Sequence, residues 1–157
     1  MIAVSRIISA QIDSKRRTVS GSRVIDASAD DIFDVLADPA RHGEFDGSGT
    51  VGRARGSSSR LDLGARFAMD MKLGPIPYRI SNTVVEFEDD RSIAWQHVGK
   101  HRWRYELEPV DHGTKVTETF DYSTATWPKG IELIGYPERH RANIDATLER
   151  LAAIFEH

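Results

Sequence analysis

The chain has 157 residues, of which 39% are hydrophobic, and this size fits one compact domain with a core of its own. It contains no cysteine, which excludes disulfides, thiolate metal sites and cysteine nucleophiles and fits a reducing cytoplasm. Its 21 basic and 24 acidic residues give a net charge of -3, so composition offers no basic surface for nucleic acid.

The first 17 residues lack a clear hydrophobic period and end in the basic cluster Lys15, Arg16 and Arg17. We predict an N-terminal extension over residues 1–17, either loosely attached or added as an edge strand, before a domain that spans residues 18–157. Neither a membrane span nor a signal peptide is expected, because polar residues interrupt the apolar run and no small-residue cleavage site follows it.

A strand and two short helices are expected after this extension. The segment TVSGSRVIDA predicts a strand over residues 18–27. Ser28 can cap a helix over residues 29–38, which must end before Pro39. A second helical turn over residues 40–44 is expected, followed by a Gly/Ser-rich segment with at most one weak strand.

Segments in the middle of the chain alternate apolar and polar residues with a period of two. These segments cover residues 65–73, 78–87, 92–98, 102–109 and 114–122. Turn signals separate them at hairpin spacing, so they predict an antiparallel meander.

Two more helices are expected after the meander. Pro128 can open a short helix over residues 128–134, because the first turn does not need its missing N–H. The last helix covers about residues 137–155. Its apolar stripe consists of Ile144, Leu148, Leu151 and Phe155. Because a sheet of alternating strands has one apolar face to bury, we predict an α+β fold in which this helix lies across that face.

Assumed hairpin loops predict which residues lie opposite each other, and opposed residues share a face of the sheet. Loops at 74–77, 89–90 and 99–101, and a last hairpin near 111–114 with Leu107 opposite Val116, predict the other opposed pairs. These pairs are Met69 and Asn82, Met71 and Ile80, Val84 and Trp95, Asn82 and His97, His97 and Trp103, Trp95 and Tyr105, Tyr105 and Glu118, and Trp103 and Phe120. All four hairpins agree on which residues face inward.

The opening strand with IDASADDIFDVLADPARH, the hairpin EFEDDRSIAW and the closing YELEPVDHGTKVTETFDY resemble the SRPBCC or START-like superfamily, in particular its small bacterial polyketide cyclase/dehydrase-like branch. The resemblance covers about residues 18–155. It implies a helix-grip fold, in which a seven-stranded antiparallel sheet curves around the C-terminal helix, with two short helices after the first strand. Such a fold encloses a deep hydrophobic cavity, and it serves functions from lipid transport to aromatase/cyclase catalysis.

The inward-facing residues and the helix stripe together predict the wall of this cavity. We expect it to be lined by Phe67, Met69, Met71, Asn82, Val84, Trp95, His97, Trp103, Tyr105, Glu118, Phe120, Ile144 and Leu148. The Trp and Phe rings offer flat apolar walls, and methionine adapts to ligands of different shape. His140, one helical turn before Ile144, could lie near the cavity mouth.

Glu118 is a carboxylate on an otherwise apolar face, so it must be paired, hydrated or protonated. Burial would raise its pKa, and a hydrogen bond to its charged form would lower it. Tyr105, directly opposite, can supply that bond. The pair is either structural or an anchor for a ligand hydroxyl or carbonyl, or Glu118 serves as a general acid or base.

His97 and Asn82 form the second polar pair of the predicted cavity. His97 either moves a proton or orients a carbonyl, or it is a core histidine whose hydrogen bond is satisfied by Asn82. His97 and His101 stand four residues apart across a strand end and turn, which is not the arrangement of a metal pair. We therefore expect no metal and no cofactor.

Three functions stay open at this point. The first is binding of a hydrophobic small molecule such as a polyketide, a sterol, a lipid or another aromatic or polycyclic ligand. The second is an aromatase/cyclase or dehydratase in which Glu118, His97 and Tyr105 manage protons. The third is a protein-interaction module of the chaperone-activator type, which needs an exposed apolar patch that the sequence does not reveal. We expect a monomer or homodimer in the cytoplasm, with a small-molecule ligand and no nucleic acid as partner.

Overall fold

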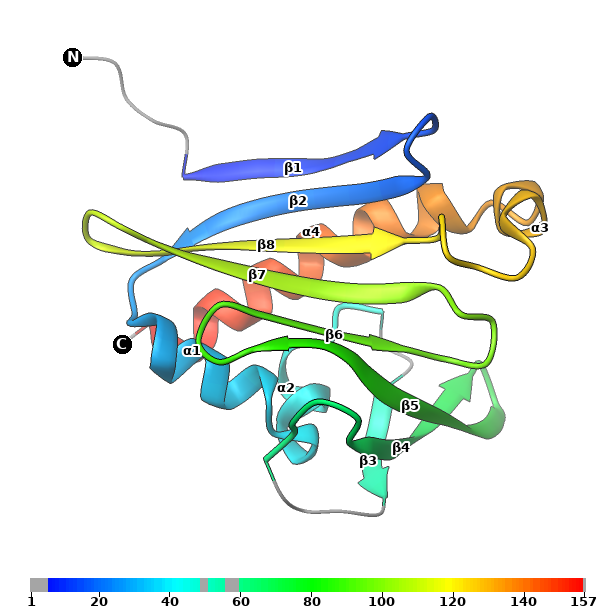
Figure 1. The fold of residues 1–157 in the computed structure, drawn as a ribbon, viewed down its shortest axis with the longest axis horizontal. Coiled ribbons are helices and arrows are strands. Elements are labelled where there is room, and N and C mark those ends of the chain that lie inside the picture. Colours follow the sequence, from blue (N-terminus) through cyan, green and yellow to red (C-terminus); the bar gives the residue numbers. More distant parts are fainter. Residues whose placement is uncertain (1–5, 49–50, 56–59, 157) are drawn as a thin grey trace.

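One antiparallel sheet of eight strands curves around a long helix in the computed structural model, which describes residues 6–48, 51–55 and 60–156 (Figure 1). The strands are β1 (Ile7–Asp13), β2 (Thr18–Ile25), β3 (Val51–Arg55), β4 (Arg66–Leu73), β5 (Ile76–Glu88), β6 (Ser92–Gln96), β7 (Arg102–Val110) and β8 (Gly113–Asp121). Their order across the sheet is β1-β2-β8-β7-β6-β5-β4-β3. The helices are α1 (Ala29–Leu36), a 3-10 turn (Pro39–Arg41), α2 (His42–Phe45), α3 (Pro128–Leu133) and α4 (Tyr136–Phe155).

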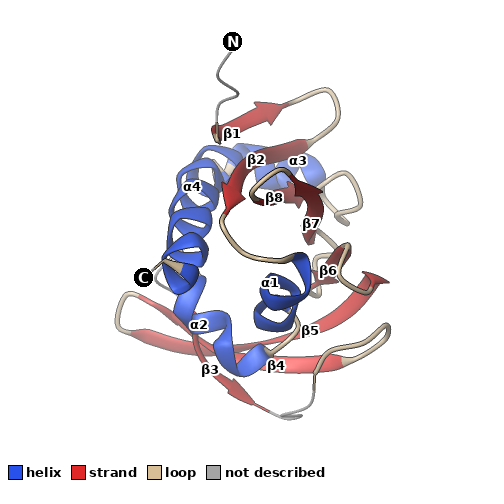
Figure 2. Cartoon of the chain, turned by 90° about the vertical axis from the view of Figure 1, so that its left-hand side faces the viewer, coloured by secondary structure: helices blue, strands red, loops and turns tan. Residues whose placement is uncertain are grey.

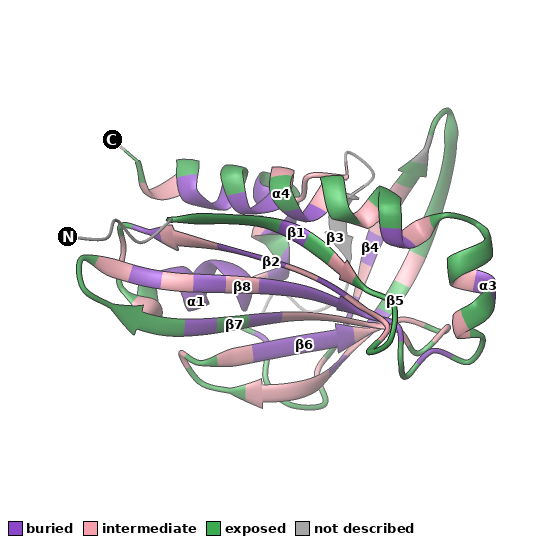
Figure 3. Ribbon diagram, turned by 90° about the horizontal axis from the view of Figure 1, so that it is seen from above, coloured by how far each residue is buried: buried purple, intermediate pink, exposed green. Residues whose placement is uncertain are grey.

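The sheet forms an arc, and α1, α2 and α4 lie on its concave side (Figure 2). The buried residues of α4 include Ile144, Leu148 and Leu151. Figure 3 shows the buried parts of α4 on the side of the helix toward the sheet. This confirms the predicted α+β helix-grip architecture. Helix α4 packs against β1, β2 and β8.

The eighth strand comes from the N-terminal extension. Strands β2 to β8 are the seven that the resemblance implies, and β1 pairs with β2 at the edge of the sheet. The register of this pair shifts between Ile8 and Gln11, and within the shift the N–H of Ala10 donates to Asp145 Oδ1 of α4 at 2.8 Å. The described part of the extension is therefore an edge strand that is tied to the terminal helix, while residues 1–5 lie outside the described residues. The division of the chain at residue 17 stays a prediction.

The first helix begins where its cap was predicted. The N–H of Asp31 donates to Ser28 Oγ at 3.4 Å, which satisfies one of the free amides of the first turn. Helix α1 buries Ile32, Phe33, Val35 and Leu36, and Pro39 then opens the 3-10 turn that leads into α2. This turn and α2 bring His42 and Phe45 under the concave face of the sheet.

The last hairpin has the predicted register, with Leu107 opposite Val116 and Tyr105 opposite Glu118. The loops at 74–77 and 99–101 were assigned wrong lengths. Strands β4 and β5 join through a two-residue turn, and β6 and β7 through a five-residue one. The observed pairs that replace the predicted ones are Phe67 and Asn82, Met69 and Ile80, Trp95 and Trp103, and Ile93 and Tyr105. Each error shifts the register by two residues, so every side chain keeps its predicted face.

In the β5–β6 hairpin, Val84 lies opposite Trp95 as predicted, although the loop is one residue longer than predicted. Its loop has three residues because Glu88 pairs with Ser92, and Asp90 adopts a positive φ of 60° there. A bulge between Val84 and Glu86 compensates for the extra loop residue. The outward-facing side chains carry the charge, since Arg104 forms salt bridges with Glu86 at 2.8 Å and with Asp121 at 3.2 Å.

Gly47 lies where the chain after α2 passes closest to α4. A Cβ at this position would lie 2.6 Å from the backbone nitrogen of Thr147 and 2.7 Å from the Ala146 Cβ. We expect Gly47→Ala to lower the free energy of unfolding by about 1–3 kcal/mol, the usual range for overpacking, as measured by urea denaturation. Gly43→Ala adds the same methyl group at an exposed position of α2 and should change stability by less than about 0.5 kcal/mol. Equal losses in both variants would contradict the close contact.

Candidate functional site

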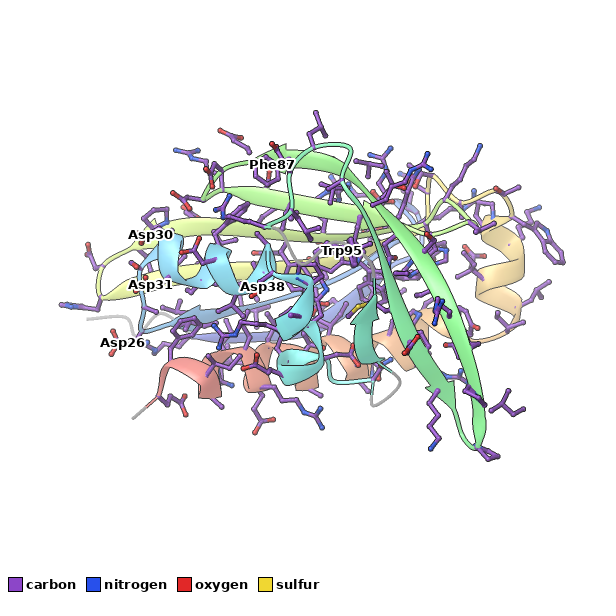
Figure 4. The ribbon with its side chains drawn as sticks, turned by 90° about the horizontal axis from the view of Figure 1, so that it is seen from below. Asp26, Asp30, Asp31, Asp38, Phe87 and Trp95 are labelled. Carbon is purple, nitrogen blue, oxygen red and sulfur yellow. The ribbon has the colours of Figure 1, made fainter. Side chains whose placement is uncertain are left out.

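A cavity of about 430 Å³ is lined by residues of the sheet, α2 and α4. Nine predicted residues line it, namely Phe67, Met69, Met71, Asn82, Trp95, His97, Trp103, Tyr105 and Glu118. His140 also lines it, as expected from its place on the last helix. In Figure 4, Trp95 lies in the interior of the molecule, between the sheet and the helices.

Four predicted lining residues do not line this cavity. Val84, Phe120, Ile144 and Leu148 are at most 3% exposed and belong to the packed core. Phe120 is covered by the rings of Trp103 and His140, with ring centroids 4.9 and 4.5 Å away. Ile144 and Leu148 belong to the stripe of α4 that packs on the sheet, so the helix contributes a different stripe to the cavity.

Several other residues line the cavity that were not predicted to do so. These residues are His42, Phe45, Asp46, Ser48, Tyr78, Ile80, His101, Tyr136, Arg139, Asn143 and Thr147. Those on α4 follow a helical spacing, because residues 136, 140, 143 and 147 lie on one side of a helix. This second, more polar stripe was readable in the sequence beside the apolar one. The short helix α2 offered no comparable period.

Glu118 and Tyr105 form a buried hydrogen-bonded pair, as predicted. The Tyr105 hydroxyl donates to Glu118 Oε2 at 2.7 Å, and the two residues are 3% and 2% exposed. Burial raises the pKa of Glu118 well above its usual value of 4.5, against the opposing effect of the Tyr105 hydrogen bond, and the charges of Asp46 and Asp145 raise it further. Burial therefore favours the uncharged form of this carboxyl group. Its Oε1 atom is buried without a partner, so the acid proton is free to be donated there.

Three histidines form a second polar group in the cavity wall. The rings of His97 and His101 are 4.9 Å apart, and His140 lies against Trp103 at 4.8 Å. Burial, followed by the proximity of the other histidines, lowers the pKa of His97 to about 3 and that of His140 to about 4. Burial also lowers the pKa of His101. All three rings are neutral at pH 7.

The expected hydrogen bond between Asn82 and His97 is wrong. Asn82 Oδ1 and His97 Nδ1 are both buried without a partner, and so is His101 Nδ1. The Asn143 amide instead donates to His140 Nδ1 at 3.2 Å, which leaves the His140 proton on Nε2. Together with Glu118 Oε1, four polar atoms that line one cavity therefore lack a hydrogen-bond partner among the described residues.

His42 extends the aromatic wall that Trp95 begins. Its ring stacks on Trp95 at 4.7 Å with an angle of 21°, and Nε2 donates to the Leu36 carbonyl at 2.8 Å. Burial lowers the pKa of His42 to about 4, although the Leu36 carbonyl and the Asp38 charge oppose this change. His42 is therefore a neutral ring held in place by the backbone of α1.

Tyr78, Tyr136 and Arg139 form the more exposed part of the lining. The Arg139 guanidinium lies 5.4 Å from the centre of the Tyr136 ring, and no other Lys or Arg is among the described residues that line the cavity. The described part of the chain contains no group of three or more His, Cys, Asp or Glu side chains able to hold a metal ion. Asp26, Asp30 and Asp31 lie beside the start of α1, away from Trp95 (Figure 4).

Apolar side chains that the sequence did not reveal as a patch are exposed near α3. Trp127, Leu133 and Ile134 are 68, 79 and 58% exposed. Most of α3 is coloured as exposed in Figure 3. The apolar positions of this six-residue helix are too few to form a stripe that the sheet could cover. No helix within the described ranges is both long and apolar enough to cross a membrane.

Residues 16–156 match the model of a protein family described as "Polyketide cyclase / dehydrase and lipid transport". The chain belongs to this family. The match confirms the resemblance to the SRPBCC or START-like superfamily that the sequence motifs indicated.

Several bacterial proteins are similar to this chain in sequence or in structure. "Uncharacterized protein Rv0088" of Mycobacterium tuberculosis is 38% identical over 146 residues, which cover 90% of this chain and 65% of that protein. The chain thus spans about 65% of the length of the curated relatives that it matches. Protein Ms6760 from Mycobacterium smegmatis has a TM-score of 0.66 at 19% identity, covering 94% of this chain and 99% of that one. The "Polyketide_cyc-like protein Cgl2372" from Corynebacterium glutamicum has a TM-score of 0.60 at 24% identity, covering 92% of each chain. These two structures are similar in fold.

Proposed function

We propose that the protein binds a hydrophobic small molecule, aromatic or polycyclic, in the cavity. The observation that carries this proposal is a cavity of about 430 Å³ with aromatic walls and four buried polar atoms that lack partners. Drug-sized ligands occupy pockets of about 300–1,000 Å³, mostly apolar with a few placed polar groups. A cytoplasmic location, which the absence of cysteine suggests, is part of the same proposal.

The volume of the cavity argues for an occupant. If it were an empty apolar void, about 24 cal/mol per Å³ would make it cost roughly 10 kcal/mol, which is comparable to the whole stability of a domain. Water would relieve this cost, and at about 30 Å³ each roughly 14 molecules would fill the space. Most of them would lie against Trp, Phe and Met side chains, where they lack hydrogen-bond partners. An apolar ligand that displaces these water molecules gains binding affinity from their release into the solvent.

Native mass spectrometry of the freshly purified protein, before and after organic extraction, tests the proposal. We expect a stoichiometric small molecule that extraction removes. Ile80→Trp, which places a larger side chain in the cavity wall, should reduce the bound fraction at least tenfold. Ser81→Trp adds a similar bulk at the adjacent exposed position of β5 and should leave the bound fraction unchanged. If Ile80→Trp retains the same molecule at the same stoichiometry, the cavity is not the binding site.

A cyclase or dehydratase is the second candidate, and one observation favours it. Burial favours the protonated form of Glu118, and its Oε1 is unpartnered, so a ligand carbonyl placed within about 3 Å of that atom could receive its proton. Glu118→Gln separates the two functions, because an enzyme would lose turnover and keep its ligand, whereas a carrier has no turnover to lose. His97→Ala tests the second proposed proton carrier in the same way. Full activity of both variants on a proven substrate would contradict these roles.

A further inference from the structure

The unpartnered polar atoms of the cavity fall into two groups. The inner pole consists of Glu118 Oε1, with Tyr105 holding the other carboxyl oxygen. The outer pole consists of Asn82 Oδ1, His97 Nδ1 and His101 Nδ1. Buried polar atoms without partners are rare in folded proteins, so each pole is suited to a hydrogen-bonding group from outside the chain.

The register of the sheet separates the poles along the strands. Tyr105 is opposite both Glu118 and Ile93, and His97 lies four residues beyond Ile93. At about 3.3 Å per residue, the part of β6 from Ile93 to Gln96, the residue before His97, is roughly 10 Å long. Side chains from both ends extend into the cavity and shorten this span.

The wall between the poles is aromatic. Trp95 and Trp103 are paired across β6 and β7, and Phe67 meets the Trp95 ring edge-on at 5.7 Å and 83°. Flat rings of this kind favour an aromatic ligand through offset or edge-to-face contacts. A ligand that satisfies both poles must therefore carry its polar groups at opposite ends of an apolar skeleton.

The deep part of the cavity offers no charge to an ionised ligand. Burial lowers the pKa values of the lining histidines below 6.5 and favours the uncharged form of Glu118. The one lining cation within the described residues, Arg139, is in the exposed part over Tyr136. The Asp46 carboxyl accepts from Ser48 and would repel an anion. A ligand carboxylate would lose its hydration there without gaining a cation.

We propose that the cavity selects an uncharged aromatic molecule with a hydrogen-bonding oxygen at each of two opposite ends, and that it discriminates against the corresponding carboxylate. This inference rests on the proposed function, because it specifies the chemical class of the ligand. The inner pole donates to one oxygen through Glu118 Oε1, and the outer pole accepts from the other through Asn82 Oδ1.

Four naphthalene derivatives test the inference by isothermal titration at pH 7. They are naphthalene, 2-naphthol, 2,6-dihydroxynaphthalene and 6-hydroxy-2-naphthoate. We expect the diol to bind at least tenfold more tightly than 2-naphthol and at least tenfold more tightly than the naphthoate. A naphthoate that binds as tightly as the diol overturns the inference, and so does a diol with no advantage over 2-naphthol. If naphthalene and 2-naphthol bind in either of these cases, the proposed function stands, whereas a series in which no member binds overturns both.

Variants at each pole assign the preference to named atoms. Glu118→Leu removes the inner donor and should bring the diol to the affinity of 2-naphthol, whereas Glu118→Gln keeps an N–H donor and should preserve the preference within about threefold. Asn82→Leu removes the outer acceptor and should have the same effect as Glu118→Leu, so it serves as a second test should the latter fail to fold. A full diol preference in a folded Glu118→Leu or Asn82→Leu variant overturns the assignment of the poles.

Discussion

Lowering the pH from 6.5 to 5 is expected to reduce the free energy of unfolding by about 3 kcal/mol, before most carboxylates titrate. The cause is the set of buried neutral histidines, because the folded-state pKa values of His42, His97 and His140 are lowered to about 4, 3 and 4 from an ordinary 6.5. Below pH 6.5 the three histidines take up protons in the unfolded chain but not in the folded chain. Their contribution to the free energy of unfolding is therefore fully present above pH 6.5 and is lost as the pH falls. As the pH falls below 6.5, each histidine lowers the free energy of unfolding by up to about 1.4 kcal/mol per pH unit. Glu118 raises it by a similar amount, which offsets the effect of one of the three histidines.

Neighbouring basic groups lower the pKa values of two of these histidines further. His97 faces His101 and His140, and His140 also faces Arg139, so a proton on one of these groups disfavours a proton on the next. Asp38 favours a charge on His42, but burial dominates there. Urea denaturation at pH 7, 6 and 5 measures the slope, which gives the number of protons taken up on unfolding.

Two histidine variants show whether the slope comes from the cavity. His140→Leu should reduce the proton uptake by about one. His112→Asn is the matched control, because His112 is exposed in the β7–β8 turn with a φ of 65° that asparagine tolerates. A slope that stays the same in His140→Leu, or falls equally in His112→Asn, would contradict the assignment.

The fold was predictable because period-two alternation determines which face a side chain occupies. The loops at 74–77 and 99–101 were predicted with wrong lengths, and each error shifted the register by two residues. Because side chains alternate between faces, Trp95, Trp103 and Tyr105 stayed on the predicted face. The bulge beside Val84 was not predictable, because nothing in the local sequence distinguishes it from a regular strand. A separate error concerns the β6–β7 loop, which was predicted too short. The prediction therefore placed His97 opposite Trp103, whereas Trp95 lies opposite Trp103 in the structure.

The candidate site was predictable where strands carry it and obscure where helices do. Glu118 and Tyr105 could be paired from register alone, and their hydrogen bond has the predicted partners. His42 and Asp46 reach the cavity through a 3-10 turn and a four-residue helix, whose direction depends on packing against α4. Phe120 was assigned to the cavity wall because sequence periodicity gives the face of a residue, but it does not show which rings cover it.

Replacing Glu118 with Gln is expected to stabilise the protein at pH 8 while changing little at pH 4.5. The folded-state pKa of Glu118 is raised well above 4.5, first by burial and then by the charges of Asp46 and Asp145, so its contribution is complete below pH 4.5 and is lost as the pH rises. The loss amounts to about 1.4 kcal/mol per pH unit until the folded-state pKa is reached. Glutamine has no proton to lose, and its amide oxygen can still accept from Tyr105.

Paired urea denaturation of the wild type and Glu118→Gln at pH 5 and pH 8 measures this difference. The stability of the wild type should be highest near pH 6.5, between the loss caused by the histidines and the loss caused by Glu118, and the variant should lack the decline on the alkaline side. Glu106→Gln, at an exposed position of β7 next to Tyr105, is the control for removing a carboxyl group from the surface. A difference between the wild type and Glu118→Gln that stays constant from pH 5 to pH 8 would mean that Glu118 is ionised in the folded protein. The deep part of the cavity would then carry a negative charge, and Oε1 would have no proton to donate to a ligand.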